Sequence, residues 1–476
     1  MLEFMQWLNN KYSSAVAPVL YIKLGLPKHI INVSERYDKM KNSRVVLGVL
    51  IAAVLVLSGC SIGAKNEDNY NSTSEQEQFI EKETTQKGTD ESTKEHETIK
   101  DEYSTQTNEQ TNEIIPIKDQ IAKMTLDKKI GQMLIVGFKG YEIDENVRKM
   151  IQKYHVGGVI LFRNNIENPD QLLSLVNSIK GINSKNRTPL FISVDEEGGR
   201  ISRMPEQLHK LPSNEIIGEV NNSDFSYEIG RVLAAEVKSF GFNMNFAPVL
   251  DIFSNPQNKV IADRAFGTDA DIVSKLGVQT MKGIRAGGVI PVVKHFPGHG
   301  DTLIDSHVGL PSVNHDMKRL ESFEFVPFEA AIDNQADAVM IAHILMNSID
   351  PKNPASLSKV VITDVLREKM NFDGVVITDD MTMGAIEKYY NIGDAVVKSV
   401  NAGSDIILVC HGYDNQVNAF IAFKAAVKNG KISEERVNES VYRILLLKNK
   451  YKLTDDKTVS ISVDEINKKI DAVLVK

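Results

Sequence analysis

Cysteine is nearly absent from the sequence, which holds only Cys60 and Cys410 among 476 residues. Neither lies in a spacing that binds zinc or an iron–sulfur cluster, so the sequence predicts no metal centre. Cys410 ends the apolar run Ile406–Cys410 and is expected to be a small buried side chain rather than half of a disulfide. No other pattern indicates a cofactor, and we predict that the protein needs none.

An excess of positive charge is missing too. The net charge is −8, which argues against nucleic acid as a partner. Residues 61–115 carry fourteen acidic side chains against five lysines, and almost no large apolar side chains. Such a composition cannot bury enough surface to offset the entropy lost on ordering. We therefore predict an acidic, disordered tether over residues 61–115.

The one long uncharged apolar run, residues 45–57, has 13 residues and is too short to span a membrane comfortably. It follows a basic stretch and ends at Leu57–Cys60 (Leu-Ser-Gly-Cys), an order typical of a secretory signal peptide. That ending resembles the bacterial lipobox, which implies that Cys60 is lipidated. We expect residues 1–60 to be an upstream extension and lipoprotein signal peptide, with translation beginning at Met40. The resemblance implies a lipid anchor in the cell membrane, at its extracytoplasmic face; an uncleaved signal anchor is the alternative.

From residue 116 onward, short apolar and β-branched runs alternate with amphipathic stretches such as Asp224–Phe240 and Gln416–Val427. This alternation indicates an α/β fold with strands buried on both faces of a parallel sheet. Eight such strands within about 340 residues predict a single (β/α)8 barrel of the TIM type over residues 116–453, with 454–476 as a C-terminal tail. The predicted strands are Met133–Phe138, Gly157–Phe162, Pro189–Asp195, Phe242–Asp251, Val289–His295, Ala338–His343, Gly374–Asp379 and Asp405–Cys410.

Polar residues at the strand ends favour the barrel over its alternative, a doubly wound open sheet. In a barrel the carboxyl ends of all strands converge on one face, where active sites are built. In an open sheet they are strung along an edge. No Gly-rich phosphate-binding motif follows the first predicted strand, which argues against a nucleotide site. The polar residues at predicted strand ends are Asp195, Asp251, Lys294, His295, His343 and Asp379.

The densest group of reactive side chains lies in residues 294–307, which hold three histidines, a lysine and two aspartates. Pro297 and Gly298 dictate an irregular loop after a strand end. Histidine and aspartate are also metal ligands, but a Pro-Gly pair interrupts the histidine spacing, which matches no metal-binding pattern. We therefore expect an active-site loop here.

The run Lys294–Gly300 (Lys-His-Phe-Pro-Gly-His-Gly), followed by Asp305-Ser306-His307, resembles glycoside hydrolase family 3 in its β-N-acetylglucosaminidase (β-N-acetylhexosaminidase) branch. The resemblance covers residues 118–453. In that branch a loop histidine replaces the glutamate that acts as acid/base in most other members. The resemblance implies that His307 is the general acid/base and Asp305 its partner. Such a pairing is chemically sound, because histidine titrates near neutrality and a carboxylate on one ring nitrogen fixes its tautomer.

The resemblance also implies a nucleophile and a set of substrate-binding residues. Val375–Met381 is similar to the family's nucleophile strand, which implies that Asp379 attacks the anomeric carbon, with Asp380 as the alternative. Successive side chains of an extended chain point to opposite sides, so only one of the two is expected to face the barrel mouth. The implied substrate-binding residues are Asp195, Arg203, Arg264, Lys294 and His295.

Roles of the neighbouring residues are less determined. Family members usually carry Gln where Glu196 stands, so an extra charge is expected near the pocket. Asp263 resembles a sugar-contacting partner of Arg264. Asp251 and His343 fit either the site or its scaffold. Three further residues are expected mainly to brace the loops: Glu197, Arg200 and His299.

The implied function is retaining hydrolysis of terminal non-reducing β-linked N-acetylglucosamine, from peptidoglycan fragments or chitooligosaccharides, through a glycosyl-aspartate intermediate. Phosphorolysis is one alternative, because a histidine does not repel phosphate as a carboxylate does. A β-glucosidase is another, but such members usually carry a second α/β domain, and only residues 454–476 follow the barrel region. An inactive carbohydrate-binding lipoprotein would have lost a catalytic position, yet Asp379, Asp305 and His307 are all present.

Overall fold

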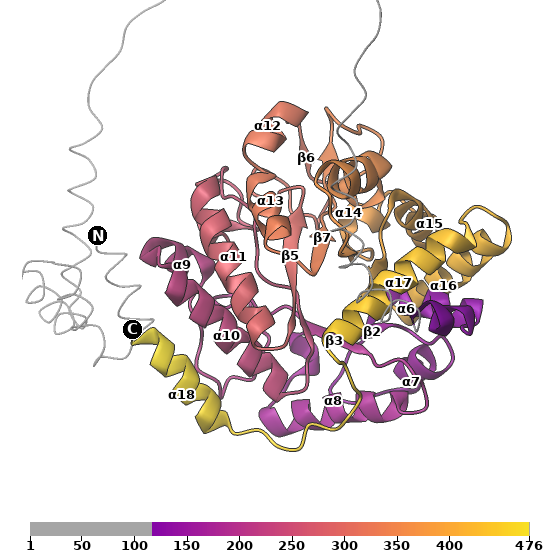
Figure 1. The fold of residues 1–476 in the computed structure, drawn as a ribbon, viewed down its shortest axis with the longest axis horizontal. Coiled ribbons are helices and arrows are strands. Elements are labelled where there is room, and N and C mark those ends of the chain that lie inside the picture. Colours follow the sequence, from indigo (N-terminus) through magenta and orange to yellow (C-terminus); the bar gives the residue numbers. More distant parts are fainter. Residues whose placement is uncertain (1–116, 476) are drawn as a thin grey trace, which may run out of the picture. The chain divides into compact units, whose positions relative to one another are not determined.

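Eight parallel strands close into a barrel in the computed structural model, which describes residues 117–475. The order around the barrel is β1-β10-β9-β7-β5-β4-β3-β2, and helices surround these strands (Figure 1). The predicted TIM-type barrel is confirmed. Its strands are β1 (Leu134–Gly137), β2 (Gly158–Leu161), β3 (Phe191–Val194), β4 (Met244–Asn245), β5 (Ile290–Phe296), β7 (Ala338–Ile341), β9 (Val375–Asp380) and β10 (Ile406–Val409). A separate parallel pair consists of β6 (Ser312–Val313) and β8 (Leu345–Met346).

Polar caps set where several of the surrounding helices begin. The side chains of Asn168, Asn222, Asp269 and Ser433 accept hydrogen bonds from the first-turn N–H groups of α8, α10, α11 and α17. The helices are α6 (Leu126–Gln132), α7 (Glu145–Gln152), α8 (Pro169–Asn183), α9 (Asn214–Val220), α10 (Ser223–Ser239), α11 (Ala270–Ala286), α12 (Met317–Ser322), α13 (Val326–Asp333), η4 (Val360–Lys369), α14 (Gly384–Glu387), α15 (Ile392–Ala402), α16 (Tyr413–Lys428), α17 (Glu434–Lys450) and α18 (Val463–Leu474).

The fourth strand is much shorter than predicted. The sequence predicts a strand over Phe242–Asp251, but β4 covers only Met244–Asn245. Pro248 has no N–H to donate to a neighbouring strand, so the ladder is interrupted there. Pairing resumes as a single bridge between Val249 and Lys294. Backbone hydrogen bonds to β5 nevertheless continue along the barrel wall: Val292 N donates to Ala247 O, Lys294 N to Pro248 O, and Leu250 N to Lys294 O.

The C-terminal segment predicted as a tail is packed against the barrel. Helix α18 buries Ile466, Ile470 and Val473 and lies beside α10. Its Asn467 accepts from the N–H of His209 at 2.8 Å and donates to the carbonyl of Gln207 at 3.0 Å. The helix thus supports the loop that follows Arg203, one of the predicted substrate-binding residues.

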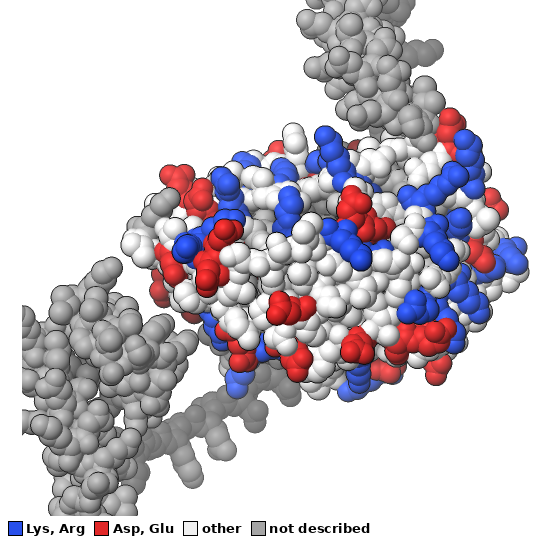
Figure 2. Space-filling model, turned by 90° about the horizontal axis from the view of Figure 1, so that it is seen from below, with Lys and Arg blue, Asp and Glu red and all other residues white. Residues whose placement is uncertain are grey.

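The predicted signal peptide, Cys60 and the acidic tether lie outside the described residues. Within residues 117–475 no helix combines the length and apolar character needed to cross a membrane. On the face of the barrel seen in Figure 2, Lys and Arg side chains are interspersed with Asp and Glu rather than gathered into one patch. Mixed signs of this kind are typical of a solvated exterior.

Candidate active site

A cavity of about 400 Å³ opens at the carboxyl ends of the barrel strands. Strand ends β3, β5 and β9 and the loops that follow them supply most of its charged lining, and Arg264 joins it from the segment after β4. The structure therefore brings together side chains as far apart in the sequence as Ile160 and His411. Every predicted substrate-binding residue and two of the three predicted catalytic residues line it: Asp195, Arg203, Arg264, Lys294, His295, His307 and Asp379.

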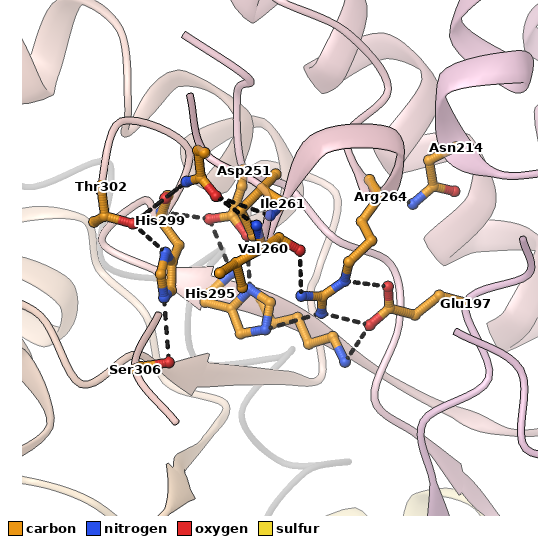
Figure 3. Close-up of polar contacts among 12 residues, drawn as sticks. Glu197, Asn214, Asp251, Val260, Ile261, Arg264, His295, His299, Thr302 and Ser306 are labelled. Atoms are coloured by element: carbon orange, nitrogen blue, oxygen red, sulfur yellow. Dashed lines mark hydrogen bonds and ion pairs between the residues drawn. The ribbon is translucent and has the colours of Figure 1, made fainter. Parts of the chain in front are cut away.

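Lys294 joins two carboxylates on one wall of the cavity. Its Nζ lies 2.6 Å from Asp195 Oδ1 and 2.7 Å from Glu197 Oε1. Arg264 holds the same Glu197 with two hydrogen bonds, of 2.9 Å from Nε and 2.8 Å from Nη2 (Figure 3). The side chains of Lys294 and Glu197 are each only 2% exposed. Glu197, expected from the sequence to brace loops, does so by binding both cations and also lines the cavity.

Glu197 and the two neighbouring cations keep one another charged despite their burial. Burial raises the pKa of Glu197, but the positive charges of Arg264 and Lys294 outweigh it and hold that pKa well below its ordinary value. Burial lowers the pKa of Arg264, but the charge of Glu197 and its hydrogen bonds raise that pKa above its ordinary value. The wall is thus a fixed array of charged donors and acceptors, suited to binding sugar hydroxyls with directional hydrogen bonds.

Asp251 orients His295 from behind the cavity. Its Oδ2 lies 2.6 Å from His295 Nδ1, and its Oδ1 accepts from the N–H of His299 at 2.6 Å (Figure 3). Burial raises the pKa of Asp251, but the charge of His295 and its hydrogen bond bring the pKa below its ordinary value. Asp251 does not line the cavity. Of the two roles that the sequence left open, it has the scaffolding one.

Two further buried histidines brace the site. His299 lies 2.7 Å from Thr302 Oγ1 through Nδ1 and 3.4 Å from Ser306 Oγ through Nε2. Burial lowers its pKa to about 4, so it is neutral at physiological pH. His343 is fully buried, with Nδ1 2.6 Å from Ser356 Oγ and Nε2 2.9 Å from the carbonyl oxygen of Asp380. His299 lines the cavity, whereas His343 does not and belongs to the scaffold.

Asp379 and Asp380, at the end of β9, have different partners. The carboxylate of Asp380 accepts from Thr382 N at 3.0 Å, Thr382 Oγ1 at 2.6 Å and Cys410 N at 2.9 Å. That of Asp379 accepts only from Asp380 N, at 2.8 Å, among the described residues. Both line the cavity, so the expectation that only one faces the mouth is wrong: the register between β9 and β10 is irregular there, with Ile377 opposite Ile406 but Asp380 opposite Leu408. Of the two carboxylates, that of Asp379 has fewer hydrogen-bond partners among the described residues.

Ionisation of Asp379 is favoured by the surrounding histidines. Burial raises the pKa of this carboxyl, but the charges of His343 and His295 and the N–H of Asp380 outweigh burial, so the pKa lies below its ordinary value. A nucleophilic carboxylate must be ionised to attack. The environment of Asp379 supplies that state over the whole neutral range.

Asp305 and His307 lie on the loop that follows β5. Asp305 Oδ1 accepts from the backbone N–H of His307 at 2.9 Å and lies 2.9 Å from its Nδ1. Burial raises the pKa of Asp305, but these hydrogen bonds lower it below its ordinary value. Asp305 therefore stays ionised and holds Nδ1, which leaves Nε2 for a ligand. The His307 side chain is 70% exposed and lines the cavity, whereas Asp305 stands behind it.

Glu196 does not line the cavity, so the extra charge expected at the pocket is not part of its lining. Its Oε2 accepts from the N–H groups of Arg203, at 2.7 Å, and Met204, at 3.3 Å. Arg203 itself lines the cavity, and its Nε is buried without a hydrogen-bond partner among the described residues. Glu196 thus shapes the loop that presents Arg203. Asp263 also stays outside the cavity and pairs with Arg200 at 2.5 Å.

Glu236→Gln is expected to reduce the loss of stability between pH 5 and pH 8. Burial raises the pKa of Glu196 to about 7 and, helped by the charge of Glu196, raises that of Glu236 well above its ordinary 4.5. The folded protein therefore holds protons that the unfolded chain has released. Their contribution is fully present below the unfolded pKa and is lost as the pH rises through the folded pKa values.

Thermal melts at both pH values check this expectation. The exposed Glu219→Gln on α9 is the matched control and should follow the wild type. If Glu236→Gln loses as much stability between pH 5 and pH 8 as the wild type does, the raised pKa values of Glu196 and Glu236 are not the cause of that loss.

The sequence did not predict the cavity wall formed by the segment after β9. Five of its residues line the cavity: Thr382, Met383, Gly384, Glu387 and Lys388. A signal was available, because residues that follow a barrel strand at its carboxyl end lie on the active-site face. The same reasoning applies to Phe162 after β2 and His411 after β10, which also line the cavity with ring centroids 5.2 Å apart.

A closed parallel barrel with an ionised carboxylate, an Asp–His pair and buried cations at its carboxyl-terminal face defines an enzyme of the TIM-barrel class. The chain belongs to glycosyl hydrolase family 3, since the model of that family's N-terminal domain matches residues 125–447. The resemblance inferred from the loop motif is confirmed.

Two relatives and one solved structure are similar to this chain over about two thirds of its length or more. Beta-hexosaminidase A of Pseudoalteromonas piscicida is 33% identical over 367 residues, which is 69% of this chain and 61% of that protein. A beta-hexosaminidase of Nitrosomonas eutropha is 34% identical over 66% of this chain and 91% of its own length. The structure of a family 3 beta-N-acetylglucosaminidase from Paenibacillus sp. str. FPU-7 superposes with a TM-score of 0.70 at 41% identity, over 74% of this chain and 68% of that one. These relatives support a hydrolase of the glycosidase class.

Proposed function

We propose that the protein is a β-N-acetylhexosaminidase that removes terminal non-reducing β-linked N-acetylglucosamine with retention of configuration. One observation carries the mechanism: the ionised carboxylate of Asp379 and the imidazole of His307 line the same cavity, and Asp305 binds the Nδ1 side of that imidazole. The names of the relatives support the acetamido sugar as substrate.

The reaction proceeds in two displacements. In the first, an Asp379 carboxylate oxygen bonds to the anomeric carbon while the glycosidic C–O bond breaks, and His307 gives its Nε2 proton to the leaving oxygen. In the second, His307 takes a proton from water as that water attacks the anomeric carbon and releases Asp379. Two inversions retain the configuration. Lys294, Arg264 and Asp195 hold the sugar hydroxyls throughout.

Comparing two donors tests the specificity. Purified protein should cleave aryl β-N-acetylglucosaminide in strong preference to aryl β-glucoside. Equal or faster cleavage of the glucoside would contradict the hexosaminidase assignment. When phosphate is added, the product should still be the free sugar. Formation of a sugar 1-phosphate instead would show that the enzyme is a phosphorylase and not a hydrolase. Peptidoglycan fragments and chitooligosaccharides are the natural donors we infer, and their relative kcat/KM values decide between them.

The membrane location belongs to the same proposal. The basic, apolar and Leu-Ser-Gly-Cys order of residues 40–60 supports lipidation of Cys60 and an anchor at the extracytoplasmic face. Cells fed labelled palmitate should label the wild-type protein and not Cys60→Ser. Label retained by Cys60→Ser would contradict the anchor.

A further inference from the structure

Two contacts bind the backbone on either side of His307 to the segment that follows the nucleophile strand. The N–H of Ala385, in α14, donates to the carbonyl oxygen of Ser306 at 2.9 Å. Nζ of Lys388, one residue beyond α14, donates to the carbonyl oxygen of Val308 at 2.5 Å. His307 therefore lies between two anchored residues. Both anchoring residues, Ala385 and Lys388, follow Asp379 closely in the sequence.

Gly384 allows this segment to approach the loop closely. A Cβ placed on Gly384 would lie 2.6 Å from the carbonyl oxygen of His307 and 3.2 Å from its carbonyl carbon. Backbone atoms cannot turn aside as a flexible side chain does. Any side chain at position 384 would therefore push the backbone of His307 away from α14.

Burial does not hold His307 in place. Its side chain is 70% exposed, and its partner Asp305 is 43% exposed on the same loop. Neighbouring loop residues Leu303, Ile304 and Val308 are exposed as well. The orientation of the imidazole therefore depends on how the backbone of the loop is anchored. The proton donor must be held accurately in position relative to the nucleophile, because moving a catalytic group by about 1 Å lowers the reaction rate strongly.

We propose that residues 384–388 form a docking platform for the acid/base loop, with Gly384 and Lys388 as positioning residues. The platform links the two catalytic groups through one short stretch of chain, which runs from Asp379 through α14 to the anchors of His307. This inference rests on the proposed role of His307 as acid/base. It assigns a function to the cavity wall formed by the segment after β9.

Leaving-group dependence separates loss of acid catalysis from general damage. kcat/KM reports steps up to formation of the glycosyl-enzyme. An aryl donor with a strongly acidic phenol departs without a proton, so its kcat/KM needs no acid, whereas that of N,N′-diacetylchitobiose does. His307→Ala should therefore lower kcat/KM for the disaccharide far more than for the activated donor. Gly384→Ala should do the same, with a loss of about 10- to 100-fold for the disaccharide and about twofold or less for the aryl donor.

Lys388 supplies an independent variant with its own rescue. Lys388→Met should lower kcat/KM for the disaccharide by about threefold to tenfold, and Lys388→Arg, which still donates to the Val308 carbonyl, should restore most of it. Gly181→Ala is the matched control, because a Cβ at that helical glycine meets no atom within 4 Å. It should leave both donors unaffected. Thermal melts of each variant show whether it is folded, and the Lys388 pair decides the matter if Gly384→Ala does not fold.

The outcomes distinguish failure of the acid/base role of His307 from failure of the platform at residues 384–388. Equal losses for both donors in His307→Ala would refute the acid/base assignment and this inference with it. The expected pattern in His307→Ala, together with equal or absent losses in Gly384→Ala and Lys388→Met, would overturn the platform alone.

Discussion

Asp379→Asn is expected to lower kcat for aryl β-N-acetylglucosaminide by a factor on the order of 10⁴ while the protein stays folded. A carboxamide is a poor nucleophile and cannot form the glycosyl ester on which the second displacement depends. The carboxylate of Asp379 accepts a single hydrogen bond from the described residues, from Asp380 N. Little of the fold depends on it, so the thermal midpoint should change little.

Asp380→Asn is the matched control for this nucleophile assignment. Its carboxylate accepts three hydrogen bonds, from both Thr382 donors and from Cys410 N. Loss of part of this set should reduce the free energy of unfolding by about 1–3 kcal/mol, with a much smaller loss of kcat than in Asp379→Asn. An active Asp379→Asn beside an inactive, folded Asp380→Asn would reverse the assignment.

Glu197→Ala is expected to be the most destabilising single change in the cavity wall, by about 3–5 kcal/mol. Removing this carboxylate leaves Arg264 without its two-bond partner and takes one of two carboxylates from the buried Lys294. A charge that loses its partner in a buried position retains its full desolvation cost. KM for the sugar should rise too, because both cations line the cavity.

Asp263→Ala is the control for Glu197→Ala, because it also removes a carboxylate from an arginine. The Arg200–Asp263 pair is partly exposed, with side chains 43% and 32% accessible. Pairs of this kind contribute about 1 kcal/mol or less. Denaturant unfolding of the two variants measures the difference. Equal destabilisation would contradict the view that burial gives Glu197 its importance.

The barrel could be predicted from the sequence because its strands are short apolar runs at regular intervals. The alternation of such runs with amphipathic stretches allows few arrangements. The exception was the run Phe242–Asp251, in which apolar composition concealed a proline that removes a ladder donor. Hydrophobicity predicts that a segment is buried, but not that its backbone follows strand geometry.

Positions at strand ends predicted which residues gather near the active site, but not which way they point. Asp195 and Asp251 both follow apolar runs, yet Asp195 lines the cavity and Asp251 lies behind His295. Glu196 and Glu197 are neighbours in sequence, yet only Glu197 lines the cavity. The direction of each side chain depends on bulges, loops and partners brought from distant segments. Such partners, like the platform at residues 384–388, are defined only by the folded chain.

Trapping the intermediate tests the central claim most directly. A fluorinated N-acetylglucosaminyl donor that slows the second displacement should leave one sugar covalently bound, and mass spectrometry of the digested protein should locate it on Asp379. The product of normal turnover should correspondingly retain the β configuration when followed by NMR. A sugar attached to a different residue, or a product of inverted configuration with no adduct, would contradict a double displacement through Asp379.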